Sequence, residues 1–414
     1  MSLFFGTSGA RGIYGKEITQ DFVFQVANAF ADEKTKVYIG MDRRESSPIL
    51  HRAAVSGALS AGADVYSLGF VPTPVVSFYS RKNKTKGIMI TASHNPPEYN
   101  GIKIFEDGME LTKEKANEFL NKKVKKKNGR FFRMDAHEYF DFVLSKAKKY
   151  DGVVGVDGNG VASLLTPRIL SMMGVRVFGA NCFGGFNRNP EPNEENLKYL
   201  KAFGKKIFFA HDGDGDRVMV FYDGKIISGD ILLGMIVEEV LRDKKGIIVT
   251  TVEAGLCVRE AVERMGGKIE ITNVGSAYVG ERVMEKNALF GGEPAGEFIF
   301  PEISLCPDGI FATVFLLNMD KREKLWKRMK RFKHYPIVRK KFKVENKEAV
   351  MEKVKNEMDV EGKRSETDGI RIDGEDYWVL VRPSGTEPVV RLTVEAKEKS
   401  KCEELAKKVE KLIL

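Results

Sequence analysis

The stretch from residue 37 to residue 70 reads VYIGMDRRESSPILHRAAVSGALSAGADVYSLGF and decides the fold class of this chain. It starts with an apolar strand-like segment, passes through a polar turn into a helical pattern near 48–61, and ends in a second strand-like segment. The unit recurs twice, from residue 153 (VVGVDG, helix 166–173, VRVFGA) and from residue 247 (IIVTTV, helix 256–265, KIEITNV). Strands that alternate with helices of this length predict parallel pairs with right-handed crossovers. We therefore predict three similar α/β domains with mixed or parallel sheets.

The carboxy-terminal part follows another pattern. YWVLV at 377–381 and VVRLTVEA at 389–396 indicate neighbouring strands joined by a turn, and a helical pattern runs from residue 401 to the end. This pattern predicts a smaller α+β domain. We expect all domains to pack around a central cleft, with these boundaries: 1–148, 149–243, 244–333 and 334–414.

Composition narrows the function classes. The chain has 414 residues, a formal net charge of +9 and four scattered cysteines, Cys182, Cys257, Cys306 and Cys402. Without a CxxC pair, neither a zinc site nor a disulfide framework is indicated, and we expect reduced thiols. No long apolar run or leader pattern is present, so we expect a cytoplasmic protein without a membrane partner. The basic runs lack interleaved aromatic residues, which argues against a nucleic-acid partner, while a positive field favours acidic small molecules such as sugar phosphates.

The turn DGDGDR at 212–217 lies between the strand-like segments 207–210 and 218–222. Asp212, Asp214 and Asp216 alternate with glycines, so their side chains can converge on one point. Oxygen ligands without a nearby His or Cys suit Mg²⁺ better than Zn²⁺. An EF-hand would need Gly where Arg217 stands and helices on both sides, and a solvated acidic turn would leave three like charges repelling one another. We predict one Mg²⁺ ion per active site, with phosphate oxygens at its open positions.

Two loops carry candidate phosphate chemistry. The strand at 88–91 runs into ASHNPP, where Ser93 is the candidate nucleophile and His94 its neighbour. No GxSxG elbow surrounds Ser93, and an ordinary turn is the alternative interpretation. RPSGTEP at 382–388 combines a guanidinium, two hydroxyls and a glycine that lets backbone amides approach an oxyanion. It is a candidate phosphate-binding turn, and a plain strand-joining turn is the alternative.

Two further loops carry weaker signals. GGEPAGE at 291–297 offers Glu293 and Glu297 to sugar hydroxyls. GTSGARG at 6–12 places Arg11 among glycines, either as a phosphate contact or as part of a tight turn. The sequence contains no GxxxxGK[ST] and no GxGxxG, so ATP hydrolysis and dinucleotide binding lose their main support.

These segments, in this order, resemble the α-D-phosphohexomutase family over essentially the whole chain. The resemblance rests on FGTSGARG at 5–12, TASHNPPEYNGIKI at 91–104, AHDGDGDR at 210–217 and RPSGTEP at 382–388. It implies an isomerase that interconverts a hexose 1-phosphate and 6-phosphate, with mannose and glucose phosphates as the leading substrates. It also implies a phosphoserine enzyme and a sugar bisphosphate that serves as intermediate and activator.

The resemblance also implies roles for individual residues. Ser93 would carry the phosphoryl group and face the Mg²⁺ ion held by the three aspartates, with Arg217 beside them. Lys103 matches a position implicated in acid/base work, His94 lies beside the nucleophile, and Arg11 joins this catalytic set. Glu293 matches the glutamate of the sugar-selecting loop. The substrate phosphate that is not being transferred would be anchored by Arg382, Ser384, Gly385 and Thr386.

Two departures from the family pattern concern the sugar. The family loop often reads GExSGH, whereas Ala295 and Glu297 stand here for Ser and His, and Ala277 stands where some members carry a basic residue. Glucosamine phosphate and a pentose phosphate therefore stay open as substrates. A phosphoserine-dependent sugar phosphatase and a non-catalytic sugar-phosphate binder are the alternatives from other classes. We expect a monomer or a homodimer.

Overall fold

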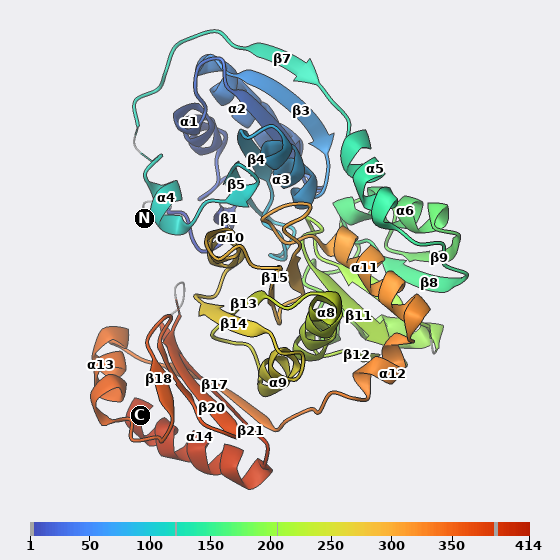
Figure 1. The fold of residues 1–414 in the computed structure, drawn as a ribbon. Coiled ribbons are helices and arrows are strands. Elements are labelled where there is room, and N and C mark those ends of the chain that lie inside the picture. Colours follow the sequence, from blue (N-terminus) through green and yellow to red (C-terminus); the bar gives the residue numbers. More distant parts are fainter. Residues whose placement is uncertain (1–3, 121, 205, 385–387) are drawn as a thin grey trace.

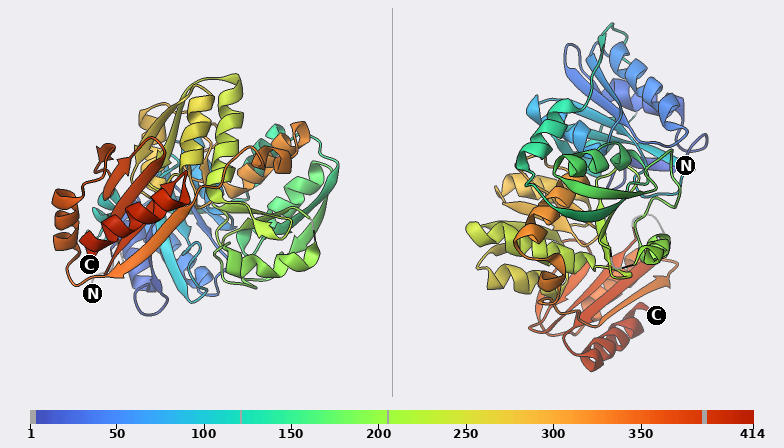
Figure 2. Two further views of the ribbon diagram at one scale, coloured as in Figure 1. Left: turned by 90° about the horizontal axis from the view of Figure 1, so that it is seen from below. Right: turned by 90° about the vertical axis from the view of Figure 1, so that its right-hand side faces the viewer.

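The computed structural model describes residues 4–120, 122–204, 206–384 and 388–414. Within these residues the strands form four sheets of seven, five, four and five strands, and each sheet is built from one continuous part of the chain (Figure 1). The four units lie around a common centre, with the last one at one end of the molecule (Figures 1 and 2). The predicted order of three larger α/β units followed by a smaller α+β unit is confirmed.

The first sheet is mixed. Its strands are β1 (Ala10–Ile13), β2 (Lys36–Met41), β3 (Asp64–Phe70), β4 (Lys86–Ile90), β5 (Tyr99–Glu106), β6 (Met109–Glu110) and β7 (Arg130–Arg133). β2 pairs in parallel with β3, as the first repeat unit predicts, and also with β4, while β5 runs antiparallel to both β4 and β1. The helices of this part are α1 (Gln20–Phe30), α2 (Ser47–Ser60), α3 (Thr73–Lys82), α4 (Lys113–Asn117) and α5 (His137–Lys146).

The second sheet carries the acidic turn. Its strands are β8 (Gly152–Asp157), β9 (Val175–Ala180), β10 (Phe208–His211), β11 (Val218–Tyr222) and β12 (Lys225–Ile226). β8 is parallel to β9 and β10, whereas β10 and β11 are antiparallel, so residues 212–217 join two neighbouring strands. The helical segments are η1 (Val161–Leu164), α6 (Thr166–Met172), α7 (Glu194–Leu197) and η2 (Lys198–Phe203).

The third sheet presents the GGEPAGE hairpin. Its strands are β13 (Ile247–Thr251), β14 (Lys268–Thr272), β15 (Phe290–Glu293) and β16 (Glu297–Ile299). β13 is parallel to β14 and β15, and β16 folds back antiparallel on β15. The helices are α8 (Gly229–Asp243), α9 (Leu256–Arg264), α10 (Ser276–Glu285), α11 (Gly309–Arg322) and α12 (Leu325–Met329). Of these, α11 contacts β11, α5 and α6 and so lies against the second sheet (Figure 1).

The fourth sheet is antiparallel throughout. Its strands are β17 (Ile337–Lys343), β18 (Lys363–Ser365), β19 (Ile370–Asp373), β20 (Tyr377–Pro383) and β21 (Val389–Ala396). The helices α13 (Lys347–Glu357) and α14 (Lys399–Ile413) contact this sheet, and α14 lies on its outer side (Figure 2). The opposite face, on which Arg382 and Arg391 are cross-strand partners, is left for the rest of the molecule.

The buried apolar clusters show which of the four units pack together. One buried apolar cluster draws residues from the first three units, among them Tyr79, Phe209 and Phe311, whereas the fourth unit has a core of its own. The fourth unit meets the third through a separate cluster of Val252, Leu256, Trp378 and Leu380. The four cysteines are free thiols. Among the described helices, none combines the length and apolar character that crossing a bilayer requires.

Candidate active site

Ser93 lies just after β4, where the first sheet faces the second. Its side chain is 1 % exposed, and its Oγ donates a hydrogen bond to Asp212 Oδ2 at 2.7 Å. The same Oγ lies 3.4 Å from His94 Nδ1. The structure therefore brings the candidate nucleophile directly to the acidic turn.

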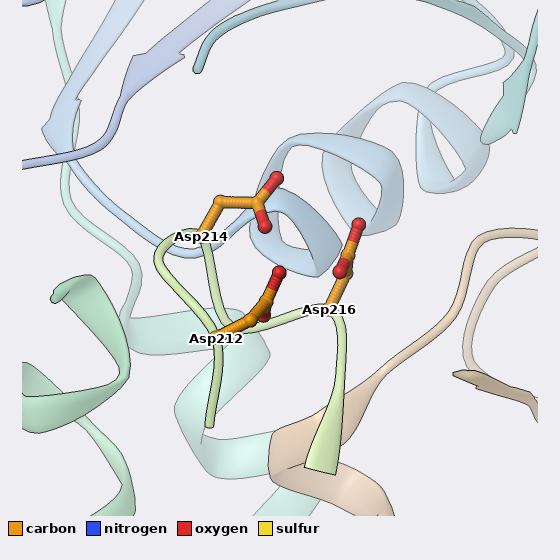
Figure 3. Close-up of side chains that lie close together, drawn as sticks. All are labelled: Asp212, Asp214 and Asp216. Atoms are coloured by element: carbon orange, nitrogen blue, oxygen red, sulfur yellow. The ribbon is translucent and has the colours of Figure 1, made fainter. Parts of the chain in front are cut away.

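The acidic turn concentrates buried carboxylates (Figure 3). Asp212, Asp214 and Asp216 are buried, and one carboxylate oxygen from each lies within 4.8 Å of the others. Asp212 Oδ1 accepts from the backbone N–H groups of Gly215 and Arg217 at 3.1 Å each, which fixes the shape of the turn. Among the described residues, Asp214 Oδ1 and Asp216 Oδ1 have no hydrogen-bond partner. Buried oxygen donors that lack partners fit a hard divalent cation, so the donor set suits Mg²⁺.

Lys103 supplies the nearest positive charge. Its Nζ lies 3.1 Å from Asp214 Oδ2 and 2.7 Å from Asp216 Oδ2. Burial alone would lower the pKa of Lys103, but these two carboxylates outweigh burial and hold the pKa well above its ordinary value. Burial raises the pKa of Asp212, and the charges of Asp216 and Asp214 raise it further. One ammonium therefore does not neutralise the turn, which leaves a demand for more positive charge.

Arg217 connects the acidic turn to the predicted sugar loop. Its Nε and Nη2 lie 2.8 and 2.6 Å from Glu297 Oε1. Glu293 lies opposite Glu297 in the β15–β16 pair and accepts from the Gly275 N–H through Oε2 at 3.2 Å, while its Oε1 has no hydrogen-bond partner among the described residues. Burial raises the pKa of Glu293, and the charge of Glu297 raises it further. The exposed Ala295 lines a cavity of about 370 Å³ together with Arg217.

Arg11 and His94 lie close to the nucleophile. Arg11 donates through Nη2 to Ser8 Oγ at 2.7 Å and through Nη1 to Asn95 Oδ1 at 3.2 Å, so it joins the amino-terminal turn to the Ser93 loop. The positive charge of Arg217, followed by burial and the charge of Arg11, lowers the pKa of His94 far below its ordinary value. The His94 imidazole is therefore neutral near pH 7.

Arg382, the first residue of the predicted phosphate-binding turn, lines a basic cavity. Arg382 Nη1 donates to Asp368 Oδ2 at 2.9 Å, and Nη2 lies 3.3 Å from Glu253 Oε1 in the third unit. The Ser384 carbonyl accepts from Lys347 Nζ at 2.8 Å. Gly385 and Thr386 lie outside the described residues.

The basic cavity has a volume of about 290 Å³. Besides Arg382, its lining includes four further cationic residues, Arg339, Lys340, Lys341 and Arg391. Pro294 lines this cavity and also the one beside Arg217, so the two cavities meet at the sugar loop. One cavity therefore lies beside Arg217, the other is basic, and both reach the sugar loop.

The sequence analysis did not predict several residues that contact the site. Thr73 donates through Oγ1 to Asp214 Oδ2 at 2.6 Å, and its N–H donates to the Asp214 carbonyl at 2.9 Å. No local signal distinguishes Thr73 from other helix-initiating threonines. Glu110 is buried near Lys103 and accepts from Ser276 Oγ at 3.3 Å, and burial raises its pKa to about 7. Arg339 and Lys341 could have been found, because alternation along one strand places them on the same face as Arg391.

Comparisons with known proteins agree with this geometry. Four models described as phosphoglucomutase/phosphomannomutase match in succession: alpha/beta/alpha domain I at 2–129, domain II at 136–225, domain III at 228–335 and the C-terminal domain at 340–412.

Curated relatives match over nearly their full length. A probable phosphoglucosamine mutase of Methanococcoides burtonii is 39 % identical over 417 residues, which covers 95 % of each chain. A probable phosphoglucosamine mutase of Pyrococcus abyssi is 37 % identical over 444 residues, covering 100 % of this chain and 98 % of the relative. Among solved structures, a phosphoglucomutase/phosphomannomutase family protein from Burkholderia thailandensis superposes with a TM-score of 0.90 at 26 % identity, covering 98 % of this chain and 96 % of that one.

Proposed function

The chain belongs to the α-D-phosphohexomutase family, whose members are phosphoglucomutase/phosphomannomutase-like isomerases, and we propose that it interconverts a hexose 1-phosphate and 6-phosphate through phosphorylated Ser93. As a phosphomutase, the enzyme is an intramolecular phosphotransferase. One observation carries the proposed chemistry: Ser93 Oγ lies 2.7 Å from Asp212 inside a buried carboxylate cluster. A nucleophile and a cation site at this distance serve phosphoryl transfer, and a simple binder needs neither.

The first transfer moves the phosphoryl group from Ser93 to the sugar. The bond between phosphorus and Ser93 Oγ breaks while a bond forms to the free hydroxyl oxygen of the sugar monophosphate. That hydroxyl loses its proton, and Ser93 Oγ gains one as the phosphoryl group leaves. His94 Nδ1 lies 3.4 Å from this Oγ. Lys103 is the candidate for acid/base work by its place in the family pattern, and its Nζ lies between the carboxylates of Asp214 and Asp216. The product is a sugar bisphosphate, and Ser93 is left as the free hydroxyl.

Charge on the moving phosphoryl group is the main barrier to this step. Asp212, Asp214 and Asp216 would hold Mg²⁺, which when bound supplies positive charge beside the phosphoryl oxygens. Arg11 of β1, Lys103 of β5 and Arg217 of the acidic turn add cationic side chains. Burial of Ser93 and the aspartates restricts water, which favours transfer to the sugar over hydrolysis. This favours a mutase over the phosphatase alternative.

The second transfer needs the bisphosphate to turn within the cleft. Its other phosphate then returns to Ser93, so that the net change exchanges the 1-phosphate with the 6-phosphate. Throughout, Arg382 and Ser384 would hold the phosphate that is not reacting, at the basic cavity. A guanidinium grips a phosphate without regard to which carbon bears it, so one basic cavity serves both halves of the reaction.

For the sugar, we propose glucosamine phosphate ahead of the mannose and glucose phosphates that the motifs alone favour. Relatives that match the whole chain are described as probable phosphoglucosamine mutases. The sugar loop supports this choice, because the buried Glu293 has an oxygen, Oε1, without a hydrogen-bond partner among the described residues, and this oxygen can accept from the ammonium group of an amino sugar. Mannose and glucose phosphates stay as the competing prediction.

The test offers four substrates to the purified protein. Glucosamine, glucose, mannose and ribose 1-phosphates are incubated with Mg²⁺ and a trace of the matching bisphosphate, and ³¹P NMR follows isomer and free phosphate separately. We expect isomerisation, fastest with glucosamine phosphate, that is lost in Ser93→Ala and kept in Ser145→Ala, a matched change at an exposed serine. Free phosphate without isomer would indicate a phosphatase. No turnover at all would indicate a binder.

A further inference from the structure

The loop that carries Ser93 is strained at the reacting residue. Ser93 has a φ of 49°, in the left-handed region that residues other than glycine rarely adopt. Such a conformation is unfavourable for a residue with a Cβ and persists only where the surroundings hold it in place. β4 ends at Ile90, so the support has to come from outside the regular sheet.

Arg44 provides part of this support. Its side chain is fully buried, and Nε donates to Asp42 Oδ2 at 3.0 Å. Its two Nη atoms donate to four backbone carbonyls of the loop, those of Ser93, Asn95, Pro96 and Tyr99, at 2.8, 2.8, 2.5 and 2.9 Å. A guanidinium has five N–H donors in one plane, and all five are used here. One rigid group therefore fixes the relative positions of four carbonyls.

Asp42 extends the support to the other side of Ser93. Its Oδ2 accepts from Thr91 Oγ1 at 2.7 Å, and Thr91 Oγ1 in turn accepts from the Ser93 N–H at 2.8 Å. Asp42 Oδ1 accepts from Ser47 Oγ at 2.6 Å. The N–H and the carbonyl of Ser93 are thus both tied to the ion pair of Asp42 and Arg44.

The same ion pair lies close to the acidic turn. Phe186, from the second unit, places its ring centroid 5.2 Å from the Arg44 guanidinium. At Gly213, between the first two aspartates, an added Cβ would lie 2.6 Å from the Ser93 carbonyl oxygen and 3.1 Å from ring atoms of Phe186. The acidic turn therefore packs directly against the peptide group that Arg44 holds. A shift of Arg44 would change the position of Ser93 relative to Asp212.

We propose that the ion pair of Asp42 and Arg44 is the positioning element of the nucleophile. It stabilises the left-handed backbone of Ser93 and aims Oγ at the acidic turn, and neither side chain contacts Ser93 Oγ. The inference rests on the proposed role of Ser93 as phosphoryl carrier. Since the pair acts on orientation, its loss should slow transfer and leave substrate affinity unchanged.

Arg44→Lys tests this proposal. A lysine keeps the charge, but it offers fewer donors without the planar geometry, so the four carbonyls lose their common anchor. Ser93 is loaded with glucose 1,6-bisphosphate, phosphate per chain is counted by intact mass, and single-turnover transfer to glucose 6-phosphate and to glucosamine 6-phosphate is timed. We expect the transfer rate per phosphorylated chain to fall about 100-fold, as misplacement by about 1 Å does, with KM unchanged. The control is Arg43→Lys, the neighbouring arginine that points to Ser163, and it should behave like the wild type.

The result that overturns the proposal is a rate per phosphorylated chain in Arg44→Lys within about threefold of the wild type, whatever its melting temperature. An arginine that only stabilised the fold would reduce the number of active chains and leave their rate unchanged. If Arg44→Lys does not fold, Thr91→Val keeps the side-chain shape and removes only the link between Asp42 and the Ser93 N–H. An unchanged rate in folded Thr91→Val would also overturn the proposal. A wild-type protein that takes no phosphate at Ser93 would overturn the proposed function itself.

Discussion

At the scale of single residues, each carboxylate of the acidic turn has a different set of partners. Asp212 faces Ser93 and two backbone N–H groups, Asp214 faces Thr73 and Lys103, and Asp216 faces Lys103. Lys103 holds the pKa of Asp214 well below its ordinary value despite burial, whereas burial and the other two aspartates raise that of Asp212. The cluster is thus arranged to keep negative charge in a buried place, which only a cation makes favourable.

Asp214→Asn should separate the role of this charge from its structural role. The amide keeps the shape and can still accept from Thr73, but it removes a full charge from the cation site. We expect kcat to fall by at least about 100-fold, with no recovery in excess Mg²⁺ and a nearly unchanged melting temperature. Turnover across a Mg²⁺ titration and circular dichroism melting are the measurements. Asp223→Asn, at an exposed turn of the same sheet, is the control, and full activity in Asp214→Asn would remove the cation from the mechanism.

Glu293→Gln should discriminate between the candidate sugars. Glutamine can still accept a hydrogen bond from a hydroxyl, but it cannot pair with an ammonium group. A charge-assisted hydrogen bond contributes about 1.5–3 kcal/mol, so kcat/KM for glucosamine phosphate should fall about 10- to 100-fold. The value for glucose phosphate should fall less. An equal fall for both sugars would show that Glu293 contacts a hydroxyl that the two sugars share, and the exposed Glu302→Gln is the matched control.

The sequence predicts some of these residues and not others for a physical reason. Three aspartates at alternate positions of a short turn must point near one another, so their convergence follows from local geometry. Arg44 and Thr73 act on partners far along the chain, and Arg44 does so mainly through backbone carbonyls. Every residue has a backbone carbonyl whatever its side chain, so no sequence motif predicts such a contact.

At the scale of elements, the start of α11 links the acidic turn to the core. Asp308 caps this helix by accepting from the N–H groups of Ile310 and Phe311 at 3.1 and 2.8 Å, and it also accepts from Tyr139 Oη at 2.9 Å. At Gly309, an added Cβ would lie 2.4 Å from the Arg217 carbonyl oxygen. The cap therefore lies directly behind the turn that holds the carboxylates.

Asp308→Ala should destabilise the protein by about 2 kcal/mol, because it removes a helix cap and leaves the Tyr139 hydroxyl buried without its acceptor. Burial raises the pKa of Asp308 to about 7, so a neutral isostere is tolerated at this position. The free energy of unfolding should accordingly fall much less in Asp308→Asn than in Asp308→Ala. Urea unfolding of the two variants is the measurement. Equal losses would indicate that the charge, and not the cap, stabilises this site.

The repeated units explain how far the elements themselves could be predicted. The strand–helix–strand pattern of residues 37–70 and of its two repeats predicts parallel strand pairs. The pairs β2–β3, β8–β9 and β13–β14 are indeed parallel. The placement of α11 against the second sheet was not predicted. A helix with apolar residues over most of its surface can pack on either neighbouring sheet, and the choice depends on contacts distant in sequence.

At the scale of the whole molecule, the amino end of α9 joins the third and fourth units. The Gly255 N–H donates to Asp230 Oδ1 at 2.8 Å, and the Leu256 N–H donates to Glu395 Oε2 of β21 at 2.7 Å. Trp378 Nε1 donates to the same Glu395 oxygen at 2.6 Å. Two carboxylates from different units thus share one helix end, and the position of the basic cavity depends on this junction.

This junction should make stability depend on pH through Asp230. Burial raises the pKa of Asp230 from the ordinary 3.8 to about 6, and Glu395 contributes in the same direction. The folded state therefore takes up a proton between about pH 4 and pH 6, so this stabilisation is complete below pH 4 and is lost as the pH rises through 6. Asp230→Asn cannot titrate and can still accept from Gly255.

We expect the free energy of unfolding of Asp230→Asn, relative to the wild type, to increase by about 2 kcal/mol between pH 4 and pH 7. Urea unfolding at closely spaced pH values measures this difference. Asp243→Asn, at the exposed far end of the same helix, should show no such increase. The hydrogen bond from Arg242 lowers the pKa of Asp243, so its carboxylate stays ionised over this range. The opposite outcome is a difference in the free energy of unfolding between Asp230→Asn and the wild type that stays constant or grows toward acid pH. It would mean that Asp230 is ionised in the folded protein, so that the helix end, and not proton uptake, stabilises the junction.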